Sequence, residues 1–252
     1  MTATFGKPPR NRLSRGVLVL AVLWLGASLA GCQATLPPQA QFAAPAVDPA
    51  YFALYDAEPD ERFAMPAIDI SAVDPQFLRR EVAYPRADPP GTIVVDPGAK
   101  FLYFVLRPGL AIRYGVGVGR EGRVWSGAAQ IRRKAEWPDW TPTREMIARD
   151  PETNGPWAGG MPGGLDNPLG ARAMYLYEGG RDTMYRLHGT REPETIGTNV
   201  SSGCIRMFNQ DVIDLFNRAR VGTNVIVLPV GQSVEPAEPE RVGAVEPADL
   251  SK

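Results

Sequence analysis

Between residues 92 and 228 the sequence consists of short apolar segments separated by glycine and proline turns, and this pattern leaves few folds open. Runs of about four to eight β-branched and aromatic residues predict strands. The expected strands are Thr92 to Asp96, Phe101 to Leu106, Ala111 to Val118, part of Arg123 to Arg133, Ala171 to Tyr177, Thr183 to Leu187 and Thr223 to Leu228. Turns such as Asp96-Pro97-Gly98 and Glu178-Gly179-Gly180 join neighbouring segments. Many short strands predict a mainly β domain.

Two helices are expected within this series. The longer one starts near Asn209, a suitable N-cap, and Asp211 favours its positive N-terminal end. Its apolar face is predicted to consist of Val212, Leu215, Phe216 and Ala219. Gly222 follows as a stop signal. A shorter helix is expected from Thr143 to Arg149.

The first 31 residues have the layout of a secretory signal, with four basic residues before the apolar run Val17 to Leu25. A transmembrane helix is the alternative, but the apolar stretch up to Ala30 is shorter than the roughly 20 residues that span a bilayer. The sequence Leu29-Ala30-Gly31-Cys32 resembles the lipobox of bacterial lipoprotein precursors, in which the cysteine is lipidated. We therefore expect Cys32 to carry an N-terminal membrane anchor.

The remainder of the chain divides by composition. Residues 32–90 are expected to form a Pro-rich linker and an N-terminal arm that packs partly on the main domain, which spans 91–230. Residues 231–252 are rich in Pro, Glu and Ala and are expected to be disordered. Gln33 follows the predicted lipidated cysteine, at the position where an aspartate would favour retention of the lipoprotein in the inner membrane. By resemblance to Gram-negative lipoproteins, the expected location is periplasmic, on the inner leaflet of the outer membrane.

The charge balance and the number of cysteines limit the functions that this chain can have. The 27 Lys and Arg nearly balance the 28 Asp and Glu, which argues against nucleic acid as a partner. The chain has two cysteines, so lipidation of Cys32 would exclude an intrachain disulfide at Cys204. Exported compartments oxidise thiols. A cysteine outside any disulfide there is either a reactive thiol or a buried, inert one, and composition leaves both interpretations open.

The single histidine and Cys204 are 16 residues apart and could form a catalytic pair. His188 ends a predicted strand, and Cys204 lies in the loop between that strand and the longer predicted helix. Such a loop can fold back so that its tip faces the strand end. A thiol is a weak nucleophile until a neighbouring imidazole takes its proton, so the two residues suit general-base and nucleophile roles in acyl transfer.

Neighbouring residues suit supporting roles. Backbone N–H groups of Gly203 and Cys204 could stabilise the oxyanion of a tetrahedral intermediate. The carbonyl of Gly189 could orient the imidazole, and Arg206 offers a planar fork for a substrate carboxylate. Simpler interpretations stay open: a packing role for His188, and a surface ion pair for Arg206. One histidine and one cysteine are too few for a usual zinc site, so no metal is expected.

The combination resembles the signature of L,D-transpeptidase catalytic domains. His188-Gly189-Thr190 is followed by Ser201-Ser202-Gly203-Cys204-Ile205-Arg206-Met207. Arg113 to Gly119, Ala135 to Thr143 and Gly163 to Gly170 also look like stretches of that family, so the likeness covers roughly residues 91–230. Many members have histidine where this chain has Ser202. The histidine usually assigned as base is the earlier one, so the substitution is expected to spare the chemistry and to alter substrate contacts or reactivity.

The resemblance implies a mainly β, sandwich-like catalytic domain with one short helix after the nucleophile loop, and no cofactor. It implies that Cys204, deprotonated by His188, attacks a peptidoglycan tetrapeptide stem at its third residue and releases D-alanine. An amine acceptor, either a second stem peptide or the lysine of an anchored lipoprotein, would then resolve the thioester. Arg206 and Ser202 would contact substrate, and residues 163–170 would form a rim over the cleft.

Two other functions stay open from the sequence. A thiol hydrolase on the same scaffold would use water in place of the amine acceptor and cut peptidoglycan or lipoprotein linkages. A non-catalytic wall-binding lipoprotein would tolerate Cys204→Ala, whereas neither enzyme would.

Overall fold

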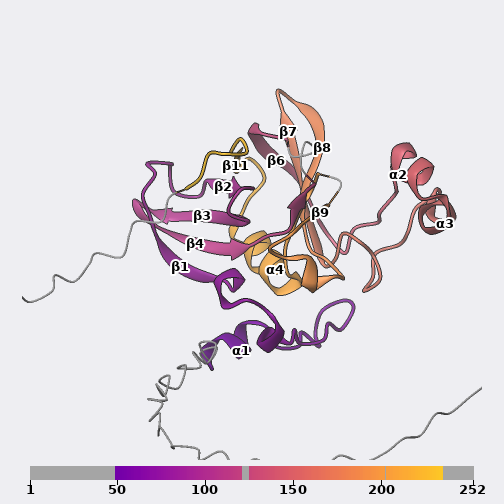
Figure 1. Cartoon of the computed structure of the whole chain (residues 1–252), viewed down its shortest axis with the longest axis horizontal. Helices are drawn as coiled ribbons and strands as arrows, with labels where there is room; N and C mark the ends of the chain where they lie inside the picture. Colours follow the sequence, from indigo (N-terminus) through magenta and orange to yellow (C-terminus); the bar gives the residue numbers. More distant parts are fainter. Residues whose placement is uncertain (1–48, 121–124, 202, 235–252) are drawn as a thin grey trace, which may run out of the picture. The chain divides into compact units, whose positions relative to one another are not determined.

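The computed structural model describes residues 49–120, 125–201 and 203–234 (Figure 1). The predicted signal segment, the linker up to residue 48 including Cys32, Ser202 and residues 235–252 lie outside the described residues. The tail predicted to be disordered began at residue 231, but residues 231–234 are described, and Val234 is buried and donates its N–H to Asp96 Oδ2 at 2.8 Å. The described residues fall within the unit formed by residues 45–252. None of the helices in the described ranges is long and apolar enough to cross a membrane.

Nine of the described strands form one sheet, in the order β1-β4-β3-β2-β11-β6-β7-β8-β10. Their bounds are β1 Arg80–Tyr84, β2 Ile93–Asp96, β3 Phe101–Arg107, β4 Gly109–Gly115, β6 Gly127–Glu136, β7 Arg172–Glu178, β8 Arg181–His188, β10 Ile205–Arg206 and β11 Asn224–Val227. Neighbours are antiparallel, except that β11 is parallel to β2 and β10 is parallel to β8. The mainly β fold predicted from the sequence is confirmed.

Both halves of this sheet bury side chains in one core. Alternate residues of β2 and β3, such as Ile93 and Leu102, meet Met174 of β7 and Leu187 of β8. Figure 1 shows β2, β3 and β4 on one side and β6, β7 and β8 on the other, with α4 near the lower ends of both groups. A single bent sheet therefore produces the sandwich-like arrangement that was expected, and burial of each large apolar side chain stabilises it by about 1.5–3 kcal/mol.

The helix after the nucleophile loop is α4, Asn209–Arg218. Its predicted apolar face is confirmed, because Val212, Leu215 and Ala219 are buried in the core and Phe216 packs against it. The predicted N-cap is wrong: Phe208 occupies that position, and no side chain caps the helix there. The side chain of Asn209 instead forms hydrogen bonds with Ala171 and Thr190.

The chain between β6 and β7, residues 137–171, leaves the sheet as an excursion. It contains α2 Arg144–Arg149, α3 Pro151–Asn154 and the 3₁₀ turn η3 Gly155–Trp157. Thr143 caps α2 by accepting a hydrogen bond from the Met146 N–H at 3.2 Å, so the short predicted helix is confirmed. Trp137 N–H donates to the Ala171 carbonyl at 2.7 Å and closes the base. Figure 1 shows α2 and α3 far out on this excursion.

The third predicted strand, across residues 111–118, is divided in the structure. β4 ends at Gly115, and β5 (Val118–Gly119) instead pairs in parallel with β9 (Asn199–Ser201). Between them, Gly117 N–H donates to the Arg206 carbonyl at 2.9 Å. A Cβ at Gly117 would meet the Thr195 carbonyl oxygen at 2.7 Å, so glycine is needed where the chain crosses between sheets.

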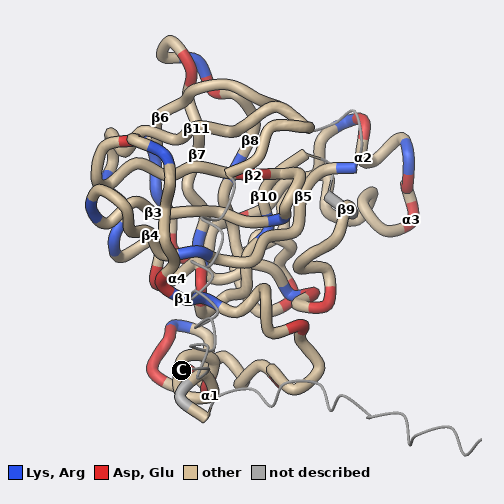
Figure 2. Tube along the Cα trace, turned by 60° about the vertical axis from the view of Figure 1, so that its left-hand side comes forward, with Lys and Arg blue, Asp and Glu red and all other residues tan. Residues whose placement is uncertain are grey.

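The N-terminal arm is more tightly joined to the sheet than the sequence indicated. It contains α1 Ala50–Leu54, the 3₁₀ turns η1 Ile70–Ala72 and η2 Pro75–Phe77, and β1, which pairs with β4. Arg79 of this arm forms ion pairs with Asp211 at 3.7 Å and Asp214 at 3.2 Å on α4. Figure 2 shows basic and acidic residues side by side where β1 and α4 meet. The arm is thus an integral part of this unit.

Candidate active site

The parallel pairing of the two-residue strand β10 with the end of β8 brings His188 and Cys204, which directly precedes β10, to one surface. In the register of β8 and β10, Arg206 lies beside His188 and Ile205 beside Leu187. Leu187 and Ile205 point into the core. Cys204 precedes Arg206 by two positions, and residues two apart in a strand share a face. Cys204 and His188 accordingly line the same cavity, of about 470 Å³.

The imidazole of His188 is buried and oriented by its neighbour. Its Nδ1 lies 2.6 Å from the Gly189 carbonyl oxygen, the contact expected from the sequence. Because a carbonyl only accepts, Nδ1 carries the proton and Nε2 of the neutral ring keeps its lone pair. Burial, together with the charges of Arg206 and Arg186, lowers the pKa of His188 to about 4, although the hydrogen bond with Gly189 opposes this. At neutral pH the ring is therefore able to accept a proton.

Asn209 supports the strand end from α4. Its Oδ1 accepts from the Ala171 N–H at 3.0 Å, and its Nδ2 donates to the Thr190 carbonyl at 3.0 Å. A Cβ on Gly189 would lie 2.1 Å from that Oδ1, and one on Gly170 would lie 2.3 Å from it. Gly170 and Gly189 thus leave room for an amide on α4 that binds the residue before β7 and the loop after β8.

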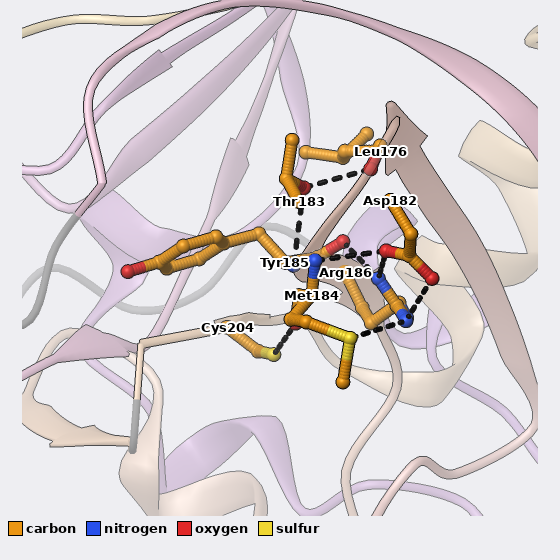
Figure 3. Close-up of polar contacts among 7 residues, drawn as sticks. All are labelled: Leu176, Asp182, Thr183, Met184, Tyr185, Arg186 and Cys204. Carbon is orange, nitrogen blue, oxygen red and sulfur yellow. Dashed lines mark hydrogen bonds and ion pairs between the residues drawn. The ribbon is translucent and has the colours of Figure 1, made fainter. Parts of the chain in front are cut away.

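The thiol of Cys204 is half-buried and donates to the Met184 carbonyl at 3.8 Å (Figure 3). Burial raises the pKa of the thiol, while the backbone N–H of Arg186 and the charges of Arg186 and Arg206 oppose this. The resting site therefore combines a protonated thiol with a neutral imidazole at neutral pH. Such a thiol needs a base when it attacks, and His188 has the capacity to act as one.

A left-handed turn in β8 lies next to the sulfur. Met184 has φ 64, a conformation that typically costs a non-glycine residue about 1–3 kcal/mol. Asp182 holds the turn: Oδ1 accepts from the Met184 N–H at 2.8 Å, and both carboxylate oxygens bind the Arg186 guanidinium at 2.6 and 2.8 Å (Figure 3). Sequence reasoning missed Asp182, because an alternating strand pattern gives no sign of this turn.

Gly203 precedes the nucleophile and also lines the cavity. Its φ of 137 is one that residues with a Cβ rarely adopt, so a glycine is needed at this position. The predicted oxyanion donors, the N–H groups of Gly203 and Cys204, are thus at the cavity wall, and their role stays a prediction.

Arg206 is engaged by a carboxylate of the chain itself. Its Nη1 lies 2.8 Å from Glu192 Oε2, and its side chain is 20% exposed. The sequence had offered both a substrate-carboxylate role and an ion pair for this residue, and the structure contains the ion pair. Glu192 was missed, because nothing in its own surroundings in the sequence marks it as a partner of Arg206.

The excursion supplies the opposite wall of the cavity. Trp140 and Met146 come from its outward half, and Pro168 and Leu169 from the segment predicted as a rim. Asn167 anchors that segment by donating to the carbonyls of Pro138, Met161 and Pro162 at 3.0 to 3.2 Å. Across the described ranges, no group of three or more His, Cys, Asp or Glu side chains is arranged to hold a metal ion.

Similarity to known proteins agrees with this geometry. The probable L,D-transpeptidase YbiS of Escherichia coli (strain K12) is 33% identical over 152 residues, which is 58% of this chain and 47% of that protein. The probable L,D-transpeptidase ErfK/SrfK of the same strain is 34% identical over 149 residues, or 57% of this chain and 46% of that protein. The chain therefore spans about half the length of the curated relatives it matches.

A solved structure from Brucella melitensis, described as a probable carnitine operon oxidoreductase, is 49% identical and has a TM-score of 0.44; the match covers 64% of this chain and 99% of that chain. The family model YkuD, described as the L,D-transpeptidase catalytic domain, matches residues 90–227. Since this match spans more than half of the sequence and includes both His188 and Cys204, the chain belongs to the L,D-transpeptidase catalytic domain family.

Proposed function

We propose that this protein transfers acyl groups of peptidoglycan stem peptides through a thioester on Cys204. The observation that carries the proposal is the shared cavity of a protonated thiol and a neutral imidazole, whose Nδ1 is held by the Gly189 carbonyl. Family membership supports the choice of reaction and substrate, because the curated relatives are described as L,D-transpeptidases.

In the first step, His188 Nε2 takes the thiol proton as Cys204 Sγ attacks the carbonyl carbon of the third residue of a tetrapeptide stem. The N–H groups of Gly203 and Cys204 stabilise the oxyanion that forms. As the tetrahedral intermediate collapses, the imidazolium returns the proton to the nitrogen of D-alanine. The C–N bond breaks, D-alanine leaves, and a thioester remains on Cys204.

In the second step, an amine acceptor attacks the thioester carbon and passes a proton to His188. The new C–N bond forms, the C–S bond breaks, and the sulfur recovers its proton. The acceptor is a second stem peptide or the lysine of an anchored lipoprotein. With water in the acceptor's place the same site would act as a hydrolase, so the product distinguishes the two reactions.

The purified chain should be incubated with a disaccharide-tetrapeptide, with and without an amine acceptor, and the products analysed by mass spectrometry beside Cys204→Ala. A cross-linked product that needs both Cys204 and the acceptor, with release of D-alanine, supports transpeptidation. Release of D-alanine without a new amide bond would instead assign hydrolysis. Unaltered substrate with folded wild-type protein would refute the catalytic proposal.

We also propose that lipidation of Cys32 anchors the protein in the periplasm, at the inner leaflet of the outer membrane, by the resemblance of its lipobox. Metabolic labelling with an alkyne fatty acid, followed by membrane fractionation, tests this. Label and outer-membrane recovery should both be lost in Cys32→Ala, and equal labelling of that variant would contradict the anchor.

A further inference from the structure

A second row of side chains lies beside the His188 row on the same face of the sheet. Arg133 of β6 is next to Tyr175 of β7, which is next to Arg186 of β8. The row two residues further along these strands consists of Ala135, Ala173 and His188. Residues two apart share a face, so both rows belong to one surface. Arg133, Tyr175, Arg186 and His188 all line the cavity of Cys204.

Tyr175 supports both arginines of its row. The guanidinium carbon of Arg133 lies 4.4 Å from the ring centroid, and that of Arg186 lies 4.5 Å from it. Tyr175 is buried, whereas Arg133 is exposed and lines the cavity. A guanidinium stacked on a ring keeps its N–H edge available, so the stack holds Arg133 in place without using its hydrogen-bond donors.

The other arginines of the cavity already face carboxylates of the chain. Arg186 is bound by both oxygens of Asp182, and Arg206 pairs with Glu192. Arg149 lies 3.9 Å from Glu145 within α2. For Arg133, the described part of the chain contains no carboxylate at ion-pair distance, and the Asp182 carboxylate, which interacts with it at longer range, is already bound to Arg186. It is therefore the guanidinium whose fork is best placed to receive an anion from outside.

We propose that Arg133 forms a carboxylate subsite for the acyl donor, binding the carboxylate on the residue that precedes the attacked one. This inference rests on the proposed acyl transfer to Cys204. It assigns the recognition of a stem carboxylate to Arg133, whereas the sequence analysis had assigned it to Arg206.

The spacing of the sheet favours the carboxylate of the residue that precedes the attacked one. Strands lie about 4.8 Å apart and residues two apart about 6.7 Å, so the Arg133 Cα is roughly 12 Å from the His188 Cα. The carboxylate of a leaving amino acid is only about 4 Å from the attacked carbon. A carboxylate on the second residue of the stem lies further from the nucleophile, on the part of the donor that stays bound. That position matches an arginine two strands away.

The test compares two donors in the absence of any acceptor, so that only the acylation of Cys204 is measured. One is a tetrapeptide with a free carboxylate on its second residue, and the other carries a carboxamide there. Wild type should favour the carboxylate donor in kcat/KM for acylation by about tenfold, the size expected for a hydrogen bond to a charged group. The preference should appear mainly in KM.

Arg133→Gln should lose this preference, and Arg133→Lys should keep part of it. The matched control is Arg132→Gln, because Arg132 is adjacent and exposed but lines a different hollow with Gln130 and Tyr177. That variant removes the same charge and should keep the full preference. Equal loss in both variants would indicate a general charge effect and overturn the subsite.

Equal acylation of wild type by both donors would also overturn the subsite while leaving the proposed function intact. Discrimination between the two donors that arises only when an acceptor is added would overturn it too, because the carboxylate would then act in the second step and not in acylation. Absence of an acyl-enzyme with either donor in wild type would refute the proposed function itself.

Discussion

Glu61→Ala would remove the carboxylate that holds the N-terminal arm to the base of the excursion. Oε1 accepts from Arg172 Nη2 at 2.6 Å, while Oε2 accepts from Arg172 Nη1 at 3.0 Å and from Trp137 Nε1 at 2.9 Å. The side chains of Arg172 and Glu61 are 7% and 17% exposed. The alanine variant therefore leaves a buried guanidinium without its counter-charge.

Removal of one partner from a buried ion pair costs about 3–5 kcal/mol of unfolding free energy, and the partial exposure of Glu61 places this case near the lower figure, about 3 kcal/mol. Glu61→Gln keeps an acceptor for one N–H group and should lose less. Urea unfolding followed by circular dichroism measures both values. The matched control is Glu58→Ala, three residues earlier in the arm, since Glu58 is exposed and surface substitutions usually change stability by within about 0.5 kcal/mol.

The pH dependence of the same pair has a definite sign. Hydrogen bonds from Arg172 hold the pKa of Glu61 below its ordinary value of 4.5. A depressed pKa contributes stability above the unfolded value that is lost as pH falls through the folded one. The difference between wild type and Glu61→Gln should thus shrink below about pH 4.5. Glu61→Ala within about 1 kcal/mol of Glu58→Ala at pH 7 would refute the reasoning.

Three further predictions concern titrating groups. Burial raises the pKa of Asp211 to about 7. The unfolding free energy of wild type, relative to that of Asp211→Asn, should therefore fall as pH rises from about 4 to 7. Urea titrations measure this difference, and a value that stays constant with pH would contradict the prediction. Acylation kcat/KM should stay level down to about pH 5 and fall near the His188 pKa of about 4, and a stopped-flow acid limb near 6.5 would argue against a buried neutral base. Asp182→Asn removes a negative charge that raises the pKa of Cys204. The pH midpoint for alkylation of Cys204 by iodoacetamide should therefore move down in this variant. An unchanged or higher midpoint would exclude the coupling between Asp182 and Cys204.

Local patterns predicted most of the fold, because short strands and amphipathic helices are determined largely by residues that are close together in the sequence. The strands around Phe101–Arg107 and Arg172–Glu178 were found within a residue or two of their bounds. The cap at Asn209 was wrong because its amide bonds to Ala171 and Thr190, which are distant in the sequence. The division of the strand at Gly115–Gly117 likewise depends on crossing to Arg206.

Only part of the candidate site, likewise, could be predicted from the sequence. Cys204 and His188 were identified from their scarcity and from the motif around them, and the structure places both in one cavity. Asp182 and Glu192 were not found, since their importance comes from the left-handed turn at Met184 in β8 and from the position of the loop after that strand. Arg133 became a candidate only through the register of three strands.

The central claim is tested most directly by the mass of the acyl-enzyme. The chain is mixed with a tetrapeptide donor, quenched in acid and analysed intact, and the adduct is located by peptide mapping. We predict a gain equal to the tripeptide acyl group on the peptide that contains Cys204, much slower in His188→Gln and absent in Cys204→Ala. An adduct on another residue, or formation at an unchanged rate in His188→Gln, would contradict a thioester on Cys204 formed with His188 as base.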